Sequence, residues 1–335
     1  MTALPRVAVL DDYSGSVARM ACWDRLAGVV ELDVFIDHCG DEDALVARLT
    51  DHEIVVPIRE RTRLSRSVLE ALPQLRLVAL TGRSIGQVDL AAASDLGIVV
   101  TETGGSGASA PELAIGLMLA LARHIPHHHG GMRRGEWETR VGTELSGKTL
   151  GVLGLGRVGT RVARVGKALG MTVVAAGPTL TDERARRAGA VRMEIEELFS
   201  QSDVVTVHLR LGDTTRGIVD RALLARMRPT ALFINTARAD LVDQRALVEA
   251  LRDRRIAGAA LDVYATEPLP PDDPLREVDN VVLSPHVGYV TREAFDLFFD
   301  GAVEQIEMFV TGRTPPRVVN LTPPASASAG GPASP

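Results

Sequence analysis

The feature that most restricts the fold is the alternation of short β-branched runs with amphipathic helical segments along almost the whole chain. Such alternation is typical of parallel sheets whose crossover connections place helices on both faces. A chain of 335 residues also exceeds one ordinary core and suits two domains. The sequence therefore predicts an α/β protein with two doubly wound parallel sheets.

Strand candidates fall into two series. In the first series they are residues 7–10, 32–35, 54–57, 77–80 and 98–101, with helical patterns at 44–49 and 65–72. In the second series they are 150–154, 172–176, 204–208, 231–235, 258–263 and 281–284, followed by a last helix at 291–310. Between the series we expect a long helix that begins near Pro111, with Ser109 as its N-cap, and a Gly/His/Arg-rich break at 127–135. The Pro/Ala/Ser/Gly tail at 322–335 is predicted to be disordered.

A glycine-rich loop joins the first strand of the second series to the helical pattern that follows. Gly154, Gly156 and Gly159 form a G-x-G-x-x-G motif. The first glycine permits a tight turn, the second lets a pyrophosphate approach the backbone, and the third lets helix and strand pack closely. Its place between a strand and a helix favours a dinucleotide site over an ordinary strand-to-helix turn. This domain is therefore expected to be Rossmann-like.

The end of the next strand bears on the choice between NAD and NADP. It reaches Gly177 with no Asp or Glu to take the ribose hydroxyls. Gly177 can neither bond the ribose through a side chain nor repel a 2′-phosphate. The sequence therefore allows either NAD or NADP as the cofactor. Candidate partners for a 2′-phosphate are Arg157, Thr179 and Arg184. No Arg directly follows Gly177, which favours NAD slightly.

Polar residues follow three strands of the second series. They supply a fixed cation, Arg238, two carboxylates, Asp262 and Glu267, and an imidazole, His286. A guanidinium can grip a carboxylate and polarise a carbonyl, while a histidine oriented by a carboxylate can donate a proton. A nicotinamide carries the hydride. Each residue alone has an ordinary surface or loop explanation, but the ordered set downstream of the glycine loop favours hydride transfer to a 2-keto acid.

From about residue 75 to 310 the chain resembles the D-isomer-specific 2-hydroxyacid dehydrogenase family. The resemblance rests on the glycine loop together with INTARADLVDQRALVEAL, GAALDVYATEPLP and VVLSPHVGYVT. It implies catalytic Arg238, Glu267 and His286, with Asp262 near the nicotinamide carboxamide. It also implies a discontinuous substrate domain, 1–108 and 292–321, a cofactor domain, 109–291, and an active site in the cleft between them.

Further binding residues follow from the same comparison. Those expected at the cofactor are Gly154, Gly156, Arg157, Val158, Gly159, Gly177, His208, Thr215, Thr236, Ala237, Asp262 and Gly288. Those expected at the substrate are Arg238 and the loop residues Thr81, Gly82, Arg83 and Ser84. Backbone N–H groups of that Gly-rich loop would bind the acid. Arg83 adds a cation there, which favours a doubly charged acid.

Composition excludes several function classes. A net charge of −6 provides no general basic field for nucleic acid or anionic lipid. The longest apolar run, 113–122, is too short to span a membrane, and the N-terminus shows no signal peptide. With only two cysteines, Cys22 and Cys39, a cytoplasmic protein is expected. The consecutive histidines at 127–129 cannot converge on one ion, so no metal is expected.

In the family this region is an arm between subunits, which implies a homodimer.

Two alternatives remain beside the dehydrogenase. NAD-sensing corepressors of the same fold keep the Arg, Glu and His, so the three residues do not discriminate. The short tail without a regulatory motif favours the enzyme. Another Rossmann enzyme, such as a methyltransferase, would leave His286 and Glu267 without a role. The sequence does not distinguish among the possible substrates, which are glyoxylate, hydroxypyruvate, phosphoglycerate, bulkier keto acids and phosphite.

Overall fold

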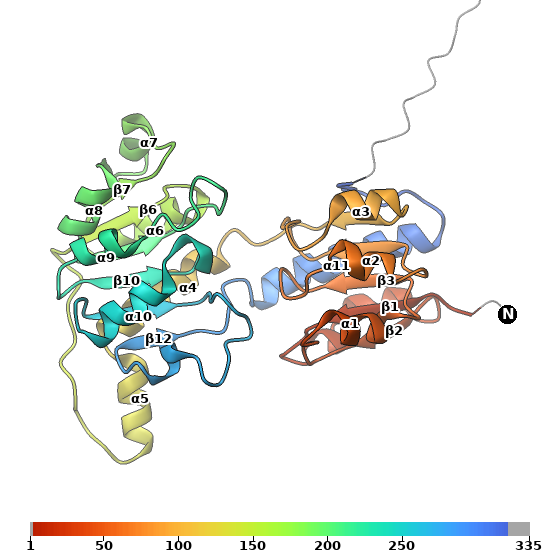
Figure 1. Cartoon of the computed structure of the whole chain (residues 1–335), viewed down its shortest axis with the longest axis horizontal. Helices are drawn as coiled ribbons and strands as arrows, with labels where there is room; N and C mark the ends of the chain where they lie inside the picture. The colour runs from red at the N-terminus through yellow and green to blue at the C-terminus, as the bar shows by residue number, and fades with distance from the viewer. Residues whose placement is uncertain (1–2, 321–335) are drawn as a thin grey trace, which may run out of the picture. The chain divides into compact units, whose positions relative to one another are not determined.

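The computed structural model describes residues 3–320 and divides into two compact units (Figure 1). Among the described residues, unit 1 comprises 3–106 and 291–320, and unit 2 is Gly107–Val290. Each unit holds one sheet in which every pair of strands is parallel, so the predicted α/β class with two parallel sheets is confirmed. The prediction for 322–335 lies outside the described residues.

Unit 1 contains a five-stranded sheet in the order β2-β1-β3-β4-β5. Its strands are β1 (Arg6–Leu10), β2 (Glu31–Val34), β3 (Ile54–Pro57), β4 (Leu77–Leu80) and β5 (Val99–Glu102). Its helices are η1 (Val17–Arg19), η2 (Ala21–Leu26), α1 (Glu42–Leu49), α2 (Arg66–Glu70), α3 (Leu90–Asp95) and α11 (Arg292–Val310). Strands β3 and β4 are buried at every position, as apolar runs covered on both faces of a sheet should be.

Unit 2 contains a seven-stranded sheet in the order β12-β11-β10-β9-β6-β7-β8. Its strands are β6 (Thr149–Leu153), β7 (Thr172–Ala176), β8 (Val191–Arg192), β9 (Val204–Val207), β10 (Leu232–Asn235), β11 (Gly258–Leu261) and β12 (Val281–Leu283). Its helices are α4 (Ser109–Ala122), α5 (Ile125–Arg133), α6 (Arg157–Ala168), α7 (Asp182–Arg187), α8 (Ile195–Gln201), α9 (Arg221–Arg226), η3 (Ala239–Leu241), α10 (Gln244–Arg252) and η4 (Pro274–Glu277).

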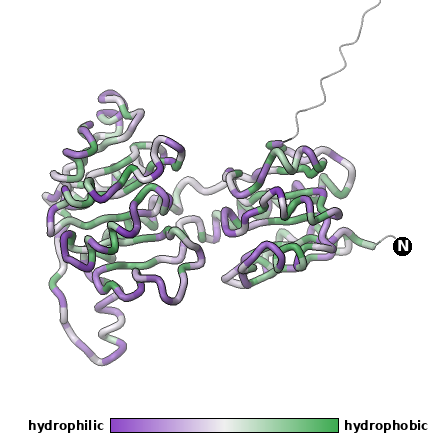
Figure 2. The backbone as a smooth tube through the Cα atoms, viewed as in Figure 1, coloured by the Kyte–Doolittle hydropathy of each residue, from purple (hydrophilic) through white to green (hydrophobic). Residues whose placement is uncertain are grey.

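The strand order of unit 2 is that of a doubly wound dinucleotide-binding sheet. Counted from β6, the order reverses between β6 and β9, which makes this pair the switch point where a ligand crevice forms at the carboxyl ends. Two buried clusters, one with Phe199 and Phe233 and one with Leu117 and Val162, make up its core. Figure 2 shows the strands of both sheets mostly in the hydrophobic colour.

Two expectations between the series were wrong. The helix α4 begins at Ser109, and its N-cap is Ala108. The backbone is already helical at Ala108, so Ser109 lies inside the helix and does not cap it. Residues 127–135 were expected to break the helical pattern, yet α5 covers most of them. Pro126 in its first turn and Arg133 in its last turn both suit a helix, which offsets the two glycines inside it. In Figure 1 α5 extends away from the rest of unit 2.

Candidate active site

The glycine loop occupies the switch point of unit 2 and closes on itself more tightly than side chains would allow. A Cβ on Gly154, whose φ is +99°, would lie 2.7 Å from the His208 carbonyl carbon, at the end of β9. A Cβ on Gly159 would lie 2.1 Å from the Gly154 carbonyl oxygen. Gly156, by contrast, has open space where a Cβ would stand, and it caps α6. This open space in front of a helix N-terminus is where a phosphate group fits.

Other residues expected at the cofactor lie around this loop in different roles. The Thr236 hydroxyl, just after β10, is buried and has no hydrogen-bond partner among residues 3–320. The Thr215 hydroxyl instead holds its own loop, donating to the Arg210 carbonyl at 2.8 Å and accepting from Gly212 N–H at 2.9 Å. His208 contacts the Thr206 hydroxyl at 2.9 Å, and burial lowers the pKa of His208 to about 4. His208 is therefore neutral at pH 7. Arg157 is exposed and Val158 half-buried.

The ribose end of this loop lacks a carboxylate, as its sequence predicts. Gly177 follows β7 and lies beside Gly154, and a Cβ there would make only ordinary contacts, the nearest at 3.7 Å. From α7, the Arg184 guanidinium donates to the Thr179 carbonyl at 2.8 Å and reaches the Leu155 carbonyl at 3.5 Å. Arg184 thus places a positive charge between the glycine loop and the end of β7.

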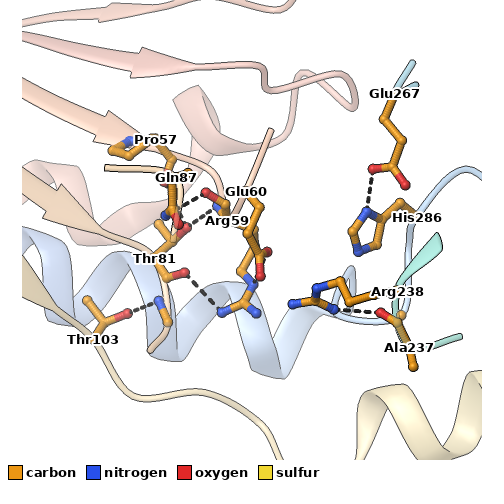
Figure 3. A network of polar contacts seen from close by, with 12 residues as sticks. Pro57, Arg59, Glu60, Thr81, Gln87, Thr103, Ala237, Arg238, Glu267 and His286 are labelled. Atoms are coloured by element: carbon orange, nitrogen blue, oxygen red, sulfur yellow. Dashed lines mark hydrogen bonds and ion pairs between the residues drawn. The ribbon is translucent and has the colours of Figure 1, made fainter. Parts of the chain in front are cut away.

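Glu267 and His286 form a direct pair at the carboxyl edge of the same sheet. The His286 Nδ1 atom lies 2.5 Å from Glu267 Oε2 (Figure 3). The other Glu267 oxygen accepts from Tyr264 N–H at 2.9 Å. The His286 side chain is 20% exposed and the Glu267 side chain 34% exposed. Because Nδ1 faces the carboxylate, Nε2 is the ring nitrogen left for a substrate.

Arg238 follows β10, the strand next to β11, so it shares this edge with the pair. The buried Asn235 side chain fixes its loop by accepting from Ala237 N–H and donating to the Arg238 carbonyl, both at 3.0 Å. The guanidinium donates to the Ala237 carbonyl at 2.6 Å (Figure 3). One fixed cation and one imidazole–carboxylate pair therefore follow three neighbouring strands.

Asp262 and Gly288 contact each other, although both were expected at the cofactor. Gly288 N–H donates to Asp262 Oδ2 at 2.9 Å, and Ser284 Oγ donates to Oδ1 at 2.6 Å. Burial is the largest influence on Asp262 and raises the pKa of its carboxyl, against the hydrogen bonds that lower it. Asp262, which follows β11, is thus hydrogen-bonded to the loop after β12 that carries His286.

The expected substrate loop lies in unit 1, after β4. Gly82 has a φ of +89°, and its N–H donates to the Thr103 hydroxyl at 2.6 Å. Thr81 donates its hydroxyl proton to the Pro57 carbonyl at 2.9 Å and accepts from Arg59 N–H at 2.7 Å. Ser84 is half-buried, and Arg83 is exposed.

Arg59, which the sequence reasoning missed, lies against this loop. Its guanidinium donates to the Thr81 carbonyl at 3.3 Å (Figure 3). It would also clash with any Cβ on Gly82. Its backbone has a φ of +55° and accepts from the Gln87 side chain at 3.0 Å. It is also paired with Glu60. The sequence indicates Arg59 only by its position just after a buried strand. Arg61 and Arg63 lie almost as close to that strand, so the position does not single out Arg59.

The described residues fit a dinucleotide better than a metal. Within residues 3–320, no three His, Cys, Asp or Glu side chains gather so as to hold a metal ion. In the same span, no helix has the length and apolar character needed to cross a bilayer. We call the loop of Gly154, Gly156 and Gly159 the glycine cradle. This cradle, with the open space at Gly156, and the unpartnered Thr236 hydroxyl suit a pyrophosphate and its attached groups.

The fold and this edge define a dinucleotide-binding α/β protein with an Arg, Glu and His set. Residues 115–288 match the family model described as D-isomer specific 2-hydroxyacid dehydrogenase, NAD binding domain. A glyoxylate reductase of Aeropyrum pernix is 38% identical over 298 residues, covering 86% of each chain. A phosphoglycerate oxidoreductase structure from Vibrio cholerae O395 has a TM-score of 0.89 at 36% identity, covering 92% of this chain and all of that one. The chain therefore belongs to the D-isomer specific 2-hydroxyacid dehydrogenase family.

Other relatives are longer than this chain. A D-3-phosphoglycerate dehydrogenase of Synechocystis is 36% identical over 301 residues, which is 89% of this chain but 54% of that relative. The chain thus spans about half the length of the curated D-3-phosphoglycerate dehydrogenases of Synechocystis and Methanocaldococcus jannaschii.

Proposed function

We propose that the protein is an NAD(P)-dependent 2-hydroxyacid dehydrogenase that interconverts a small 2-keto acid and its 2-hydroxy acid. The observation that carries this proposal is the 2.5 Å pair of His286 and Glu267 on the sheet edge that also bears Arg238 and the glycine cradle. An acid beside a cation at the ligand edge of a dinucleotide fold suits carbonyl reduction.

Each side chain has a defined task in this reaction. Arg238 binds the carboxylate of the substrate and polarises its carbonyl. His286 holds the transferable proton at Nε2 and gives it to the carbonyl oxygen, while Glu267 keeps the ring oriented and stabilises its charged form. A bound NAD(P)H supplies the hydride. In the oxidative direction His286 takes the hydroxyl proton back.

The glycine cradle predicts different outcomes for two of its glycines. Gly156→Ala should leave the melting temperature unchanged, because its Cβ meets no atom within 4 Å, yet raise the Kd for NADH about tenfold or more by filling the phosphate space. Gly159→Ala should lower both stability and affinity, because its Cβ would lie 2.1 Å from Gly154 O. Thermal melts and NADH fluorescence titrations check this; unchanged affinity in Gly156→Ala would contradict the cradle.

The ribose end supports binding of both cofactors, with NAD as the expected physiological choice. The residues directly after β7, 177–181, include no carboxylate, and Arg184 places a positive charge there. We expect Kd values for NADH and NADPH within about tenfold of each other. Gly177→Asp should weaken NADPH about tenfold or more through charge repulsion and leave NADH binding intact. Equal losses for both cofactors would place the 2′-phosphate elsewhere.

We propose a homodimer built on the segment after α4. Four large apolar side chains of this segment are strongly exposed: Ile125 is 53%, Met132 55%, Trp137 79% and Val141 86% accessible. A monomer rarely exposes so many together, and a second copy of the chain would cover them. Light scattering should give twice the mass of one chain, and Trp137→Ser should shift the mass toward one chain. A single-chain mass for the unmodified protein would contradict this.

The proposed reaction is tested by following NADH and NADPH absorbance at 340 nm against a panel of 2-keto acids. The panel includes glyoxylate, hydroxypyruvate, pyruvate, an aromatic keto acid and doubly charged acids. Turnover with any of them supports the proposal, and the preferred pair identifies the cofactor and the substrate size. Silence across the panel with NADH still bound would favour a cofactor-sensing protein of the same fold.

A further inference from the structure

The aromatic ring of Tyr289 lies against the imidazole ring of His286. The two ring centroids are 5.6 Å apart, and the ring planes meet at 75°. Aromatic pairs favour this perpendicular arrangement, because the edge of one ring then meets the face of the other. Tyr289 is only 9% exposed, so the surrounding protein holds its ring in place. His286 is therefore packed against a fixed aromatic surface.

Two short turns of the backbone bring these rings together. His286 has a φ of +52°, in the left-handed region, and its N–H donates to the Ser284 carbonyl at 3.0 Å. The next turn is closed by Val290 N–H, which donates to the Val287 carbonyl at 2.8 Å. Both rings belong to unit 2, so their contact lies within a single compact unit.

A hydrogen bond at one nitrogen does not by itself fix the plane of an imidazole ring. Glu267 contacts the His286 ring at Nδ1 (Figure 3). The torsion about the Cβ–Cγ bond of histidine has broad minima, so the ring can tilt while this hydrogen bond is kept. Such a tilt displaces Nε2, the atom left for a substrate. An aromatic ring packed against the imidazole restricts this motion.

We propose that Tyr289 is a positioning residue for His286. Its ring fixes the tilt of the imidazole, while Glu267 fixes the direction of the Nδ1 atom. The inference rests on the proposed function, in which His286 is the acid. It assigns the role to the aromatic ring of Tyr289 and not to its hydroxyl. Loss of the ring should therefore slow proton transfer and leave cofactor binding unchanged.

Tyr289→Leu keeps an apolar side chain at this position and removes the flat ring. We expect kcat to fall about tenfold, which is the scale of one lost aromatic contact. The Kd for NADH should stay within about twofold of the unmodified value. The solvent isotope effect on kcat should rise, because proton transfer from a tilted ring becomes slower relative to the other steps. An unchanged kcat, or a loss confined to NADH affinity, would overturn the proposal.

Tyr289→Phe is the matched control, because it keeps the ring and removes the hydroxyl. It should keep kcat within about twofold, with the solvent isotope effect of the unmodified protein. A loss equal to that of the leucine variant would assign the effect to the hydroxyl and overturn the proposal. Tyr289→Met fills a similar space with a flexible chain and should lose activity as leucine does. It provides the same comparison if the leucine variant does not fold, and full activity in it would contradict the role of the ring.

A second control separates positioning from a general loss of packing. Phe199, in α8 of unit 2, is fully buried in the core cluster that also contains Phe233. Phe199→Leu should lower the melting temperature without changing kcat or the solvent isotope effect. A loss of kcat equal to that of Tyr289→Leu would show that any core defect slows the reaction, and would overturn the positioning role.

The deciding experiment is a double-mutant cycle with single-turnover rates at saturating NADH. In a His286→Ala background, Tyr289→Leu should lower the rate by less than about twofold, because the ring that Tyr289 orients is absent. A loss of about tenfold that persists in this background would overturn the proposal. If His286→Ala alone keeps the normal rate, the proposed function fails. If His286→Ala is impaired and Tyr289→Leu is not, the proposed function stands and this inference alone fails.

Discussion

Replacing His286 by alanine is expected to lower kcat for reduction of a 2-keto acid by about 10²–10⁴-fold. The physical reason is the loss of the group that holds a proton at Nε2 while its Nδ1 atom stays on Glu267 at 2.5 Å. The Kd for NADH should change little, because the His286 side chain is no part of the glycine cradle. Single-turnover absorbance traces at saturating NADH, together with fluorescence titration, measure both quantities.

A second substitution shows whether Glu267 acts through His286. Glu267→Gln keeps the hydrogen bond to Tyr264 N–H possible but removes the charge that stabilises a protonated ring. It should lower kcat in the unmodified protein and have little effect in His286→Ala. An alanine variant at His286 that turns over at the normal rate would show that another group donates the proton.

Replacing Arg238 by alanine is expected to lower kcat/KM for the keto acid by about 10²–10⁴-fold, because it removes a charged hydrogen-bonding partner of the substrate carboxylate and carbonyl. Asn235 holds the backbone of this loop independently of the side chain, so the fold should persist. Initial rates over a range of keto-acid concentrations measure the loss, and circular dichroism checks the fold.

Arg238→Lys is the matched control for that prediction. Lysine keeps the charge but lacks the planar fork that engages a carboxylate through two parallel hydrogen bonds. It should recover part of the activity, with a raised KM. Full activity in the alanine variant, or a loss confined to NADH affinity, would contradict the assigned role.

The strands of both sheets could be predicted because fully buried parallel strands are continuous apolar runs, as in β3 and β4. The two-residue strand β8 was missed, because Val191 and Arg192 are both exposed and show no such run. α5 was missed because Gly130 and Gly131 have low helix propensity, which local end effects offset. Local patterns thus predict buried elements better than short or exposed ones.

The candidate site could be predicted where chemistry follows strand ends, and less well where backbone geometry decides. His286 and Glu267 were expected together, and the structure pairs them. Nothing in the sequence indicates the left-handed φ of Arg59 or the grip of Asp262 on the His286 turn. The Thr215 hydroxyl was expected to contact a cofactor, and in the structure it donates a hydrogen bond to the Arg210 carbonyl of its own loop. These features depend on contacts between residues far apart in the chain.

The central claim is that hydride passes to the second carbon of a keto acid as His286 protonates its oxygen. The most direct measurement is reduction of a substrate from the panel with NADH or NADPH deuterated in turn on each face of the nicotinamide, followed by mass spectrometry and NMR of the product. We predict one deuterium on the second carbon from one labelled face only, and loss of product in His286→Ala. A product without deuterium from either face, or no product while the cofactor is bound, would contradict the account.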